Sequence, residues 1–348
     1  MEGEIVNFIK FWLTVCISLC YCHRVGKLLP PGSGRLSAVA PVVALFLSLP
    51  LLLTSIHLGG PTCFFVAWLA NFKLLLFAPD PPLPLRRFLA VACLPIKIHD
   101  SKNGNHSQEK SSPNRRETLN PQPKSFLNYA IKALLVALMV KLYDFSDSIH
   151  PKILLLIYSW HVYFFLEIIL AVAQFLGRHL LGIELEPQFN DPYFSTSLQD
   201  FWGRRWNLTA TNILQPTVYR PTVRLASRVV GRRWAPLPAV MATFMVSAMM
   251  HELIFYYLGR MMPNWEITWF FLIHGFALTV EIMVKKILPE KLRLPAVVSG
   301  PATVAFIFST AIWLFFPQFV RLKIDEKAFE EYAALVSFVK NGAFSLVG

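Results

Sequence analysis

The fold class of this chain is set by the stretch PLPAVMATFMVSAMMHELIFYYL, which occupies residues 236–258. The only side chains in it that can carry charge at neutral pH are His251 and Glu252. A helix of about 20 apolar residues is long enough to span the hydrocarbon core of a bilayer. The stretch therefore predicts a transmembrane helix that carries a histidine and a carboxylate at membrane depth.

Apolar runs of similar length recur from one end of the chain to the other. Of its 348 residues 55% are hydrophobic, which is more than soluble domains carry. We therefore predict an all-α polytopic membrane protein that forms a single domain over residues 1–348. The expected spans, about eight in number, are residues 5–22, 36–58, 61–78, 126–142, 151–176, 236–258, 265–284 and 296–319. The apolar piece from Phe88 to Ile98 is too short to cross and is expected to be re-entrant or interfacial.

Two polar segments have different compositions. Residues 99–124 are rich in Asn, Ser, Pro and Lys and nearly free of large apolar side chains, which predicts a disordered loop. After Asp325, apolar residues recur at helical intervals, which predicts a short amphipathic helix on the surface. These residues are Phe329, Tyr332, Val336 and Val339.

Lysine and arginine are concentrated in alternate loops of the expected topology. The positive-inside rule therefore places the basic loops in the cytosol and both termini on the lumenal side. In such a protein the formal net charge of +12 meets lipid head groups and phosphates, so it does not indicate a nucleic-acid partner. The five cysteines lie in or beside apolar runs, a pattern that predicts neither a disulfide framework nor a metal site.

Residues 177–295 contain the candidate site, in a long loop and the histidine-bearing span. The densest part of the loop reads NDPYFSTSLQDFWGRRWN over residues 190–207. One interpretation is an interfacial anchor, with aromatic rings at head-group depth and arginines toward phosphate. The other is functional: Asn207 orients a group or binds an oxyanion, and the arginines bind an anionic cofactor. Composition alone leaves both open.

His251 is the strongest single candidate for chemistry. Ionisable side chains inside a membrane are costly, so they are functional candidates by default. Burial favours the neutral imidazole, which can accept a proton. The alternative is a structural histidine packed between helices. Glu252 points about 100° away around the helix, so it either orients another group or pairs with a loop arginine.

Further polar residues occur in the expected spans, namely His161, Glu167, His274 and Glu281. His274 and Glu281 share a helix face, which predicts an inward polar seam held by packing and internal hydrogen bonds rather than a catalytic site. Several familiar motifs of metalloproteases, serine hydrolases and phosphate-binding proteins are absent from the sequence. His251 has no second histidine four residues on, and no Gly-x-Ser-x-Gly elbow or Gly-Lys-Ser/Thr phosphate loop occurs.

Three stretches together resemble a known family. They are the segment over residues 190–207, VSAMMHEL over 246–253 and WLFFPQF over 313–319. They are similar to the signature of plant wax synthases, the long-chain-alcohol O-fatty-acyltransferases of the membrane-bound O-acyltransferase superfamily. The resemblance implies a helical bundle that encloses a substrate tunnel, and its hallmark histidine and asparagine fall on His251 and Asn207.

The resemblance also implies an activity. A long-chain acyl group would pass from acyl-CoA to a long-chain fatty alcohol that arrives from the membrane lipids, giving a wax ester and CoA. His251 would be the general base and Asn207 would orient it or stabilise the oxyanion, with Glu252 and Trp206 in support. No metal or permanently bound cofactor is expected.

The residues assigned to acyl-CoA binding are Trp202, Arg204, Arg205, Arg220 and Arg224. The expected location is the endoplasmic reticulum membrane, with the signature loop facing the cytosol. Two alternatives stay open: the same chemistry on diacylglycerol or a sterol, and a lipid transporter or scaffold that uses the polar seam as a pathway. The sequence leaves the oligomeric state undetermined.

Overall fold

The computed structural model of the chain describes residues 2–77, 84–93, 126–181, 188–289 and 293–345. Within these ranges the regular secondary structure is helical, with no strand. Eight of the described helical segments are long and apolar enough to cross a membrane, which confirms the predicted all-α polytopic fold. They are Gly3–Leu28, Ser33–Leu52, Ile56–Leu76, Phe126–Ser148, Pro151–Val172, Gly231–Gly259, Glu266–Ile287 and Ala296–Arg321. The loop expected at 99–124 and the end of the apolar piece at Ile98 lie outside the described residues.

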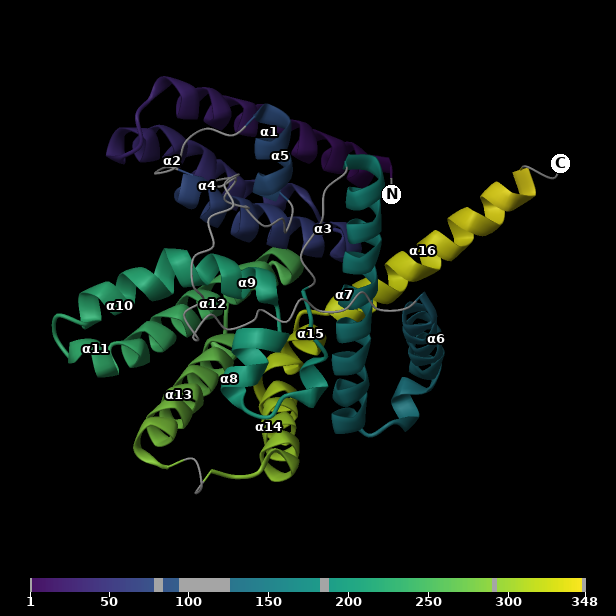
Figure 1. Cartoon of the computed structure of the whole chain (residues 1–348). Helices are drawn as coiled ribbons and strands as arrows, with labels where there is room; N and C mark the ends of the chain where they lie inside the picture. Colours follow the sequence, from purple (N-terminus) through teal and green to yellow (C-terminus); the bar gives the residue numbers. More distant parts are fainter. Residues whose placement is uncertain (1, 78–83, 94–125, 182–187, 290–292, 346–348) are drawn as a thin grey trace.

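The N-terminal helices form one layer, at the top of Figure 1. Their bounds are α1 (Glu2–Leu28), α2 (Ser33–Ser48), η1 (Leu49–Leu52), α3 (Ile56–Cys63), η2 (Phe64–Ala70), α4 (Asn71–Phe77) and α5 (Leu85–Cys93). The core of this layer packs Phe11, Val15 and Leu19 of α1 with Phe46 of α2 and Phe88 of α5. Helix α5 contacts α1 and η2, so the described part of the short apolar piece is a helix packed on this layer.

The boundary between the second and third spans differs from the prediction. The expected spans were 36–58 and 61–78, but the second segment ends at Leu52 and the third begins at Ile56. The Ser55 side chain caps the new helix by accepting a hydrogen bond from the Leu58 backbone N–H at 3.1 Å. The carboxylate of Glu4 accepts from the backbone N–H of Ser55 at 2.8 Å. Because this partner is remote in sequence, the apolar run itself does not reveal the break.

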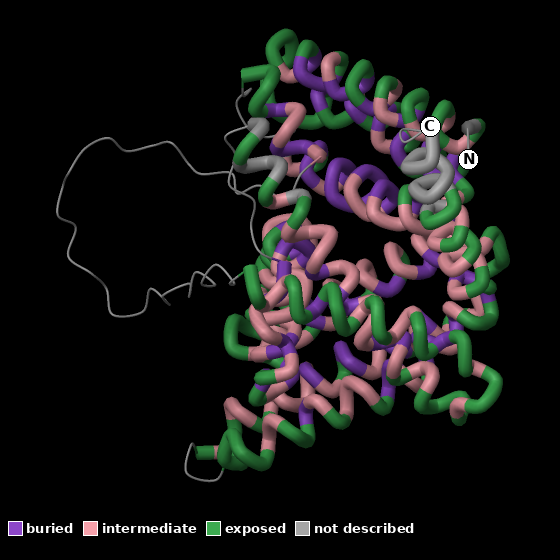
Figure 2. The backbone as a smooth tube through the Cα atoms, turned by 90° about the vertical axis from the view of Figure 1, so that its right-hand side faces the viewer, coloured by how far each residue is buried: buried purple, intermediate pink, exposed green. Residues whose placement is uncertain are grey.

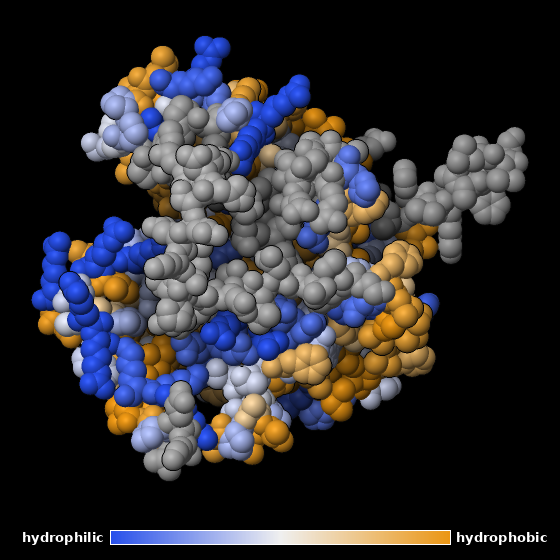
Figure 3. Space-filling view, viewed as in Figure 1, coloured by the Kyte–Doolittle hydropathy of each residue, from blue (hydrophilic) through white to orange (hydrophobic). Residues whose placement is uncertain are grey.

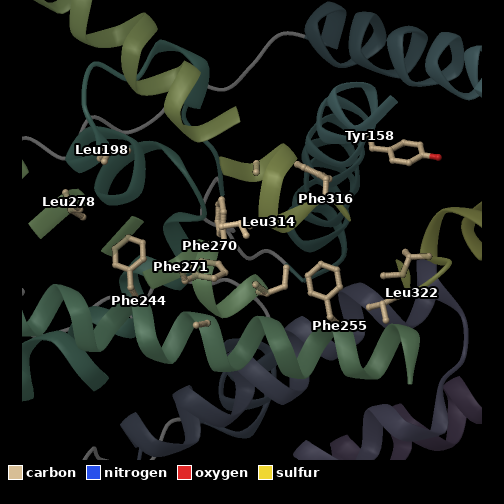
Figure 4. Packing of buried hydrophobic residues seen from close by; sticks show 14 of the residues in the cluster. Tyr158, Leu198, Phe244, Phe255, Phe270, Phe271, Leu278, Leu314, Phe316 and Leu322 are labelled. Carbon is tan, nitrogen blue, oxygen red and sulfur yellow. The ribbon is translucent and has the colours of Figure 1, made fainter. Parts of the chain in front are cut away.

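The remaining long helices form the body of the molecule. Their bounds are α6 (Phe126–Leu142), η3 (Tyr143–Ser148), α7 (Pro151–Leu181), α12 (Pro236–Gly259), α13 (Glu266–Ile287), α14 (Ala296–Thr310), η8 (Ala311–Phe315), α15 (Pro317–Arg321) and α16 (Ile324–Ser345). Helices α12 and α13 pack on each other, with Phe244 and Phe255 facing Phe270 and Phe271 in the larger core (Figure 4). Gly275 permits their close approach, since a Cβ atom there would lie 2.9 Å from Cβ of Phe244.

The outer sides of the long helices are exposed, as the green stretches of the backbone in Figure 2 show. Large side chains such as Ile17 of α1, Leu134 of α6 and Trp313 of η8 are more exposed than buried. A soluble protein rarely leaves so many large apolar side chains uncovered. These faces therefore contact lipid, and the protein is an integral membrane protein that crosses the bilayer several times.

The region expected as a long interfacial loop is folded from residue 188 onward. Its helices are η4 (Pro192–Phe194), α8 (Leu198–Asp200), η5 (Phe201–Arg205), α9 (Leu208–Leu214), η6 (Gln215–Tyr219), α10 (Arg220–Ala226) and α11 (Gly231–Trp234). Phe189 and Phe201 are buried, and Trp206 stacks on Phe201 with centroids 5.4 Å apart. Trp206 also stacks on Tyr163 of α7 at 6.1 Å. The neighbours of these rings are thus protein side chains instead of lipid head groups.

The C-terminal tail forms α16, which confirms the predicted helix. Its first half is docked: the Glu331 carboxylate accepts from Ser55 Oγ at 2.9 Å and from the backbone N–H of Ile56 at 2.6 Å. Asp325 accepts from the Tyr158 hydroxyl of α7 at 3.0 Å. The far end projects from the body (Figure 1), and Val336 is 51% exposed. The helix therefore leaves the protein surface after about its midpoint.

Candidate active site

A cavity of about 140 Å³ lies between α7, the segment 192–206, α12, α13, α14 and η8. Its lining is aromatic and aliphatic, and His251 is its only imidazole, with no carboxylate or cationic side chain among the lining residues. The lining residues are Ser159, Trp160, Tyr163, Pro192, Tyr193, Phe201, Trp202, Trp206, His251, Phe270, Phe271, Val304, Ile307, Phe308, Ala311, Phe315 and Phe316. The cavity suits the apolar end of a lipid beside one proton acceptor.

The imidazole of His251 is oriented by its own helix. Its Nδ1 lies 2.7 Å from the backbone carbonyl of Ser247, one turn earlier in α12. A carbonyl oxygen can only accept, so Nδ1 carries the proton and Nε2 keeps its lone pair. Within the described part of the chain Nε2 has no hydrogen-bond partner. This histidine therefore presents a free proton acceptor at the cavity wall.

Three aromatic rings hold the imidazole plane. Phe271 of α13 lies 4.4 Å from it, centroid to centroid, and Phe315 of η8 lies at 6.1 Å. Trp68 of η2 meets it edge to face at 5.1 Å and is 2% exposed. Sequence reasoning missed Trp68 because nothing distinguishes this tryptophan from other aromatic residues in the third span. Its structural signals are the π-helical turn that carries it, a feature often found at functional sites, and a buried indole N–H without a hydrogen-bond partner among the described residues.

Asn207 is placed beside the cavity wall but does not line the cavity. It is the N-cap of α9, with a left-handed φ of 42°, and its Oδ1 accepts from the Ala210 backbone N–H at 3.1 Å. Asparagine tolerates both roles well. His251 and Asn207 are not hydrogen-bonded to each other in the described structure. The Nδ2 amide group is the donor that this side chain still offers.

The two tryptophans of the signature segment both line the cavity. The supporting role expected of Trp206 stays a prediction. Trp202 was assigned to acyl-CoA binding, and its ring contacts Phe244 at 5.4 Å and Phe271 at 6.1 Å. Trp202 is thus part of the cavity wall, and its contact with acyl-CoA stays a prediction.

The arginines of this region fall into two groups. Arg205 is engaged inside the segment: its Nε donates to Asp200 at 2.7 Å and its Nη1 to the carbonyls of Asn190 and Asp191, each at 3.2 Å. It therefore stabilises the fold of the segment. Three others, which are exposed and have no partner among the described residues, are Arg204, Arg220 and Arg224. Figure 3 shows hydrophilic side chains gathered over α10 and α11, where the last two lie.

Glu252 turns away from His251 and caps the next helix. Its Oε1 accepts from both the backbone N–H and the hydroxyl of Thr268, each at 3.0 Å, in the first turn of α13. A carboxylate is favourable there because the first N–H groups of a helix lack internal partners. Of the two expected roles, orienting another group is the one observed, and the group is the start of α13. The expected arginine pair does not occur among the described residues.

The predicted polar seam of α13 holds the signature segment. Glu281 accepts from the backbone N–H of Leu198 at 2.8 Å, and His274 accepts from the indole N–H of Trp202 at 3.2 Å. On α7, Glu167 pairs with Lys132 of α6 at 2.8 Å. The described residues contain no group of three or more His, Cys, Asp or Glu side chains placed to hold a metal ion.

Known proteins similar to this chain are acyltransferases. The model of the membrane bound O-acyl transferase family matches residues 185–273. An acyl-CoA–sterol O-acyltransferase of Arabidopsis thaliana is 48% identical over 340 residues, 95% of this chain and 96% of the relative. A long-chain-alcohol O-fatty-acyltransferase of Simmondsia chinensis is 41% identical over 355 residues, 100% and 99% of the two chains. With such relatives over nearly its whole length, the chain belongs to the membrane-bound O-acyltransferase family and is an acyltransferase.

Proposed function

We propose that this protein transfers a long-chain fatty acyl group from acyl-CoA to the hydroxyl of a long-chain alcohol, giving a wax ester and free CoA. The observation that carries the proposal is the free Nε2 of His251 at the wall of an otherwise apolar cavity. An apolar cavity suits the ends of the lipid chains next to the reacting groups, and a single acceptor nitrogen is sufficient to activate a hydroxyl.

The proposed reaction needs one proton acceptor and balances without a further reactant. Nε2 of His251 takes the hydroxyl proton while the alcohol oxygen attacks the thioester carbonyl carbon. The carbon–sulfur bond then breaks, and the CoA thiolate receives the proton from the imidazolium. General-base assistance of this kind contributes typically ~10²–10⁴-fold. The apolar wall keeps out water, which would otherwise compete with the alcohol for the acyl group.

The proposed acyl-CoA site lies on the basic surface beside the cavity. Arg204, Arg220 and Arg224 are exposed and could bind the CoA phosphates by charge-assisted hydrogen bonds. We place this surface in the cytosol, by the positive-inside rule, and the protein in the endoplasmic reticulum membrane. Asn207 follows Trp206 of the cavity wall, and its Nδ2 is proposed to donate to the oxyanion or to the substrate carbonyl.

A sterol is the second candidate acceptor, and a specific observation favours it. The relative at 48% identity is an acyl-CoA–sterol O-acyltransferase, whereas the long-chain-alcohol relatives reach 41%. Both acceptors present a hydroxyl on an apolar body, so the same base serves either one. Diacylglycerol shares this chemistry and completes the set of acceptors to be compared.

The test is an acceptor competition in membranes that contain the full-length protein. Labelled long-chain acyl-CoA is supplied with a fatty alcohol, a sterol or diacylglycerol, and the ester products are separated and counted. The proposal predicts wax ester as the main product when all three acceptors are present. Sterol ester as the main product would select the second candidate. Absence of any new ester, with the protein present in the membrane, would reject the enzymatic proposal and favour a transporter or scaffold.

A further inference from the structure

His274 is completely buried inside the body, and both of its ring nitrogens have hydrogen-bond partners. It is 0% exposed, so its ring cannot touch a substrate. Nδ1 lies 3.2 Å from the indole nitrogen of Trp202, and Nε2 lies 2.8 Å from the hydroxyl of Thr310 at the end of α14. The histidine therefore connects the signature segment, α13 and α14 through its two nitrogens.

The chemistry of the partners fixes the direction of each hydrogen bond. An indole N–H can only donate, so Nδ1 of His274 accepts and its proton sits on Nε2. Nε2 then donates to the Thr310 hydroxyl, which in turn donates to the carbonyl of Phe306 at 2.8 Å. The chain of three donors is consistent with a neutral imidazole in one tautomer. Such a fully satisfied buried network rigidifies the groups that belong to it.

The first donor in this series of hydrogen bonds, Trp202, is part of the cavity wall. Trp202 lines the cavity, and its ring also contacts Phe271, whose own ring lies 4.4 Å from His251. The orientation of the Trp202 indole therefore sets the shape of the space in front of the base. The indole N–H of Trp202 can hold this orientation because its hydrogen bond to His274 is directional. The other contacts of the ring are with aromatic side chains, and a rotated ring could make similar contacts.

The backbone of the signature segment is held by other contacts. Glu281 accepts from the Leu198 N–H at 2.8 Å, and the Thr211 hydroxyl donates to the Trp202 carbonyl at 3.1 Å. Arg205 ties the segment to Asp200 at 2.7 Å. Loss of the His274 contact would thus free the Trp202 side chain while the segment stays docked.

We propose that His274 is a positioning residue that, through Trp202, sets the shape of the cavity in front of His251 and so determines how well different alcohol acceptors are used. This inference rests on the proposed acyl transfer and adds a residue that the sequence had assigned to structure alone. Misplacement of a cavity wall by about 1 Å can cost ~10²-fold in rate, even when the altered residue is remote from the reacting atoms.

Two substitutions of His274 separate positioning from packing. The amide oxygen of His274→Asn takes the place of Nδ1 and can still accept from Trp202, whereas the amide of His274→Gln reaches the place of Nε2 and serves Thr310. We expect His274→Asn to keep the wild-type ratio of activities across alcohols of different length. His274→Gln should lower kcat by ~10–100-fold and flatten that ratio, with the KM for acyl-CoA unchanged.

Trp202→Phe provides the matched test on the other side of the hydrogen bond. It removes the indole N–H and should reproduce the flattened ratio, and the double variant with His274→Gln should be no worse than either single one, because the two residues act as one unit. Thermal unfolding in detergent shows whether each variant is folded, and His161→Gln serves as a control histidine that does not line the cavity.

Three outcomes would overturn the inference. His274→Gln with an unchanged ratio, His274→Asn as poor as His274→Gln, or additive losses in the double variant would each show that His274 does not act through Trp202. These outcomes require an active wild-type protein. If the wild-type protein forms no ester with any acceptor, it is the proposed function that fails. Thermal unfolding of the variants would then still measure how much the hydrogen bond between His274 and Trp202 stabilises the fold.

Discussion

Two buried polar regions of this molecule use the same residue types for different ends. In the first, which we call the cavity junction, α12, α13 and η5 meet around His251. In the second, the α16 junction, α3, α7 and α16 meet around His161 and His57. His161 has both nitrogens engaged, Nδ1 with the Tyr143 hydroxyl at 3.0 Å and Nε2 with that of Tyr332 at 3.4 Å. Among the described residues, only Nδ1 of His251 has a hydrogen-bond partner.

The difference explains why one histidine is a candidate base and the other is not. A nitrogen that already accepts or donates a hydrogen bond has no lone pair for a substrate. A free Nε2 beside an apolar cavity has no competing partner until a hydroxyl enters. Burial of a histidine in the membrane is therefore not sufficient to indicate catalysis, and the number of engaged nitrogens is the more informative observation.

The carboxylates of the two regions are alike. Glu252 caps the start of α13, and Glu331 caps the start of α3, each from another helix. Both satisfy backbone N–H groups that lack partners at a helix N-terminus. Neither belongs to the cavity lining. The two junctions therefore differ in whether a histidine nitrogen is left without a partner, whereas their carboxylates have the same helix-capping role.

The largest effect is expected from a matched pair of histidine substitutions. His251→Ala should lower the rate of ester formation by ~10²–10⁴-fold, because it removes the general base. His161→Ala should leave the rate per folded molecule unchanged and lower thermal stability, because two tyrosine hydroxyls lose their partner. Both variants are assayed in membranes at equal protein amount. Wild-type activity in His251→Ala would remove this residue from the mechanism.

The second effect concerns the amide of Asn207. Asn207→Asp keeps an oxygen to cap α9 and tolerates the left-handed backbone, but it lacks the amide donor. If Nδ2 stabilises the oxyanion, kcat should fall by ~10²–10³-fold with little change in the thermal unfolding temperature. Ser55→Ala is the control, since it removes the cap of α3 at the α16 junction and should affect stability alone. Full activity in Asn207→Asp would make Asn207 a structural cap only.

A smaller effect should separate capping by Glu252 from catalytic support. Glu252→Ala leaves the N–H and hydroxyl of Thr268 unpaired, which should lower the free energy of unfolding by about 1–3 kcal/mol. Glu252→Gln retains an acceptor oxygen, so both stability and ester formation should stay close to wild type. Thermal unfolding and activity are measured on the same preparations. An inactive but stable Glu252→Gln protein would contradict the capping role and require the negative charge.

The smallest effect is a pH dependence confined to the α16 junction. Burial alone would raise the pKa of the Glu331 carboxyl, but hydrogen bonds from His57, Ile56 and Ser55 lower that pKa below its ordinary value. A lowered pKa in the folded state means that the stabilisation is complete above the unfolded pKa and is lost as pH falls through the folded one. The protection factors of α16 amides, which compare the observed exchange rate with the intrinsic rate at the same pH, should therefore fall on acidification to pH ~3.

Two comparisons decide whether this pH effect belongs to Glu331. Amides of α12, in the cavity junction, report global unfolding and should stay protected where those of α16 do not. Glu331→Gln should show low protection factors in α16 at neutral pH and no further fall on acidification. An equal fall in the protection factors of α12 and α16 in the wild-type protein would assign the effect to the whole molecule.

The spans were predictable because apolar length is a local property of the sequence. All eight expected spans correspond to described helices that are long and apolar enough to cross a membrane. The break between the second and third spans, between Leu52 and Ile56, depends on Glu4 and Glu331, which lie far away in the chain. A pattern read in a local window cannot include such partners. The folded state of residues 188–235 was missed for the same reason, since its contacts are with α7, α12 and α13.

The candidate site was predictable only in part. His251 stood out because an imidazole in an apolar span is costly. The sequence could not separate Arg205, which binds Asp200 and two carbonyls, from the exposed Arg204 next to it. It also gave no reason to connect Trp68 with His251, since these two residues come from different spans.

The sequence by itself determined that this chain is an all-α membrane protein with a histidine at membrane depth, because hydrophobicity and the cost of burying a polar group act residue by residue. Only the tertiary structure decided which nitrogen of that histidine is free, which residues line the cavity and which acids cap helices. These properties depend on hydrogen-bond directions between elements that are distant in the chain. They arise when α12, α13, α14 and the signature segment pack together.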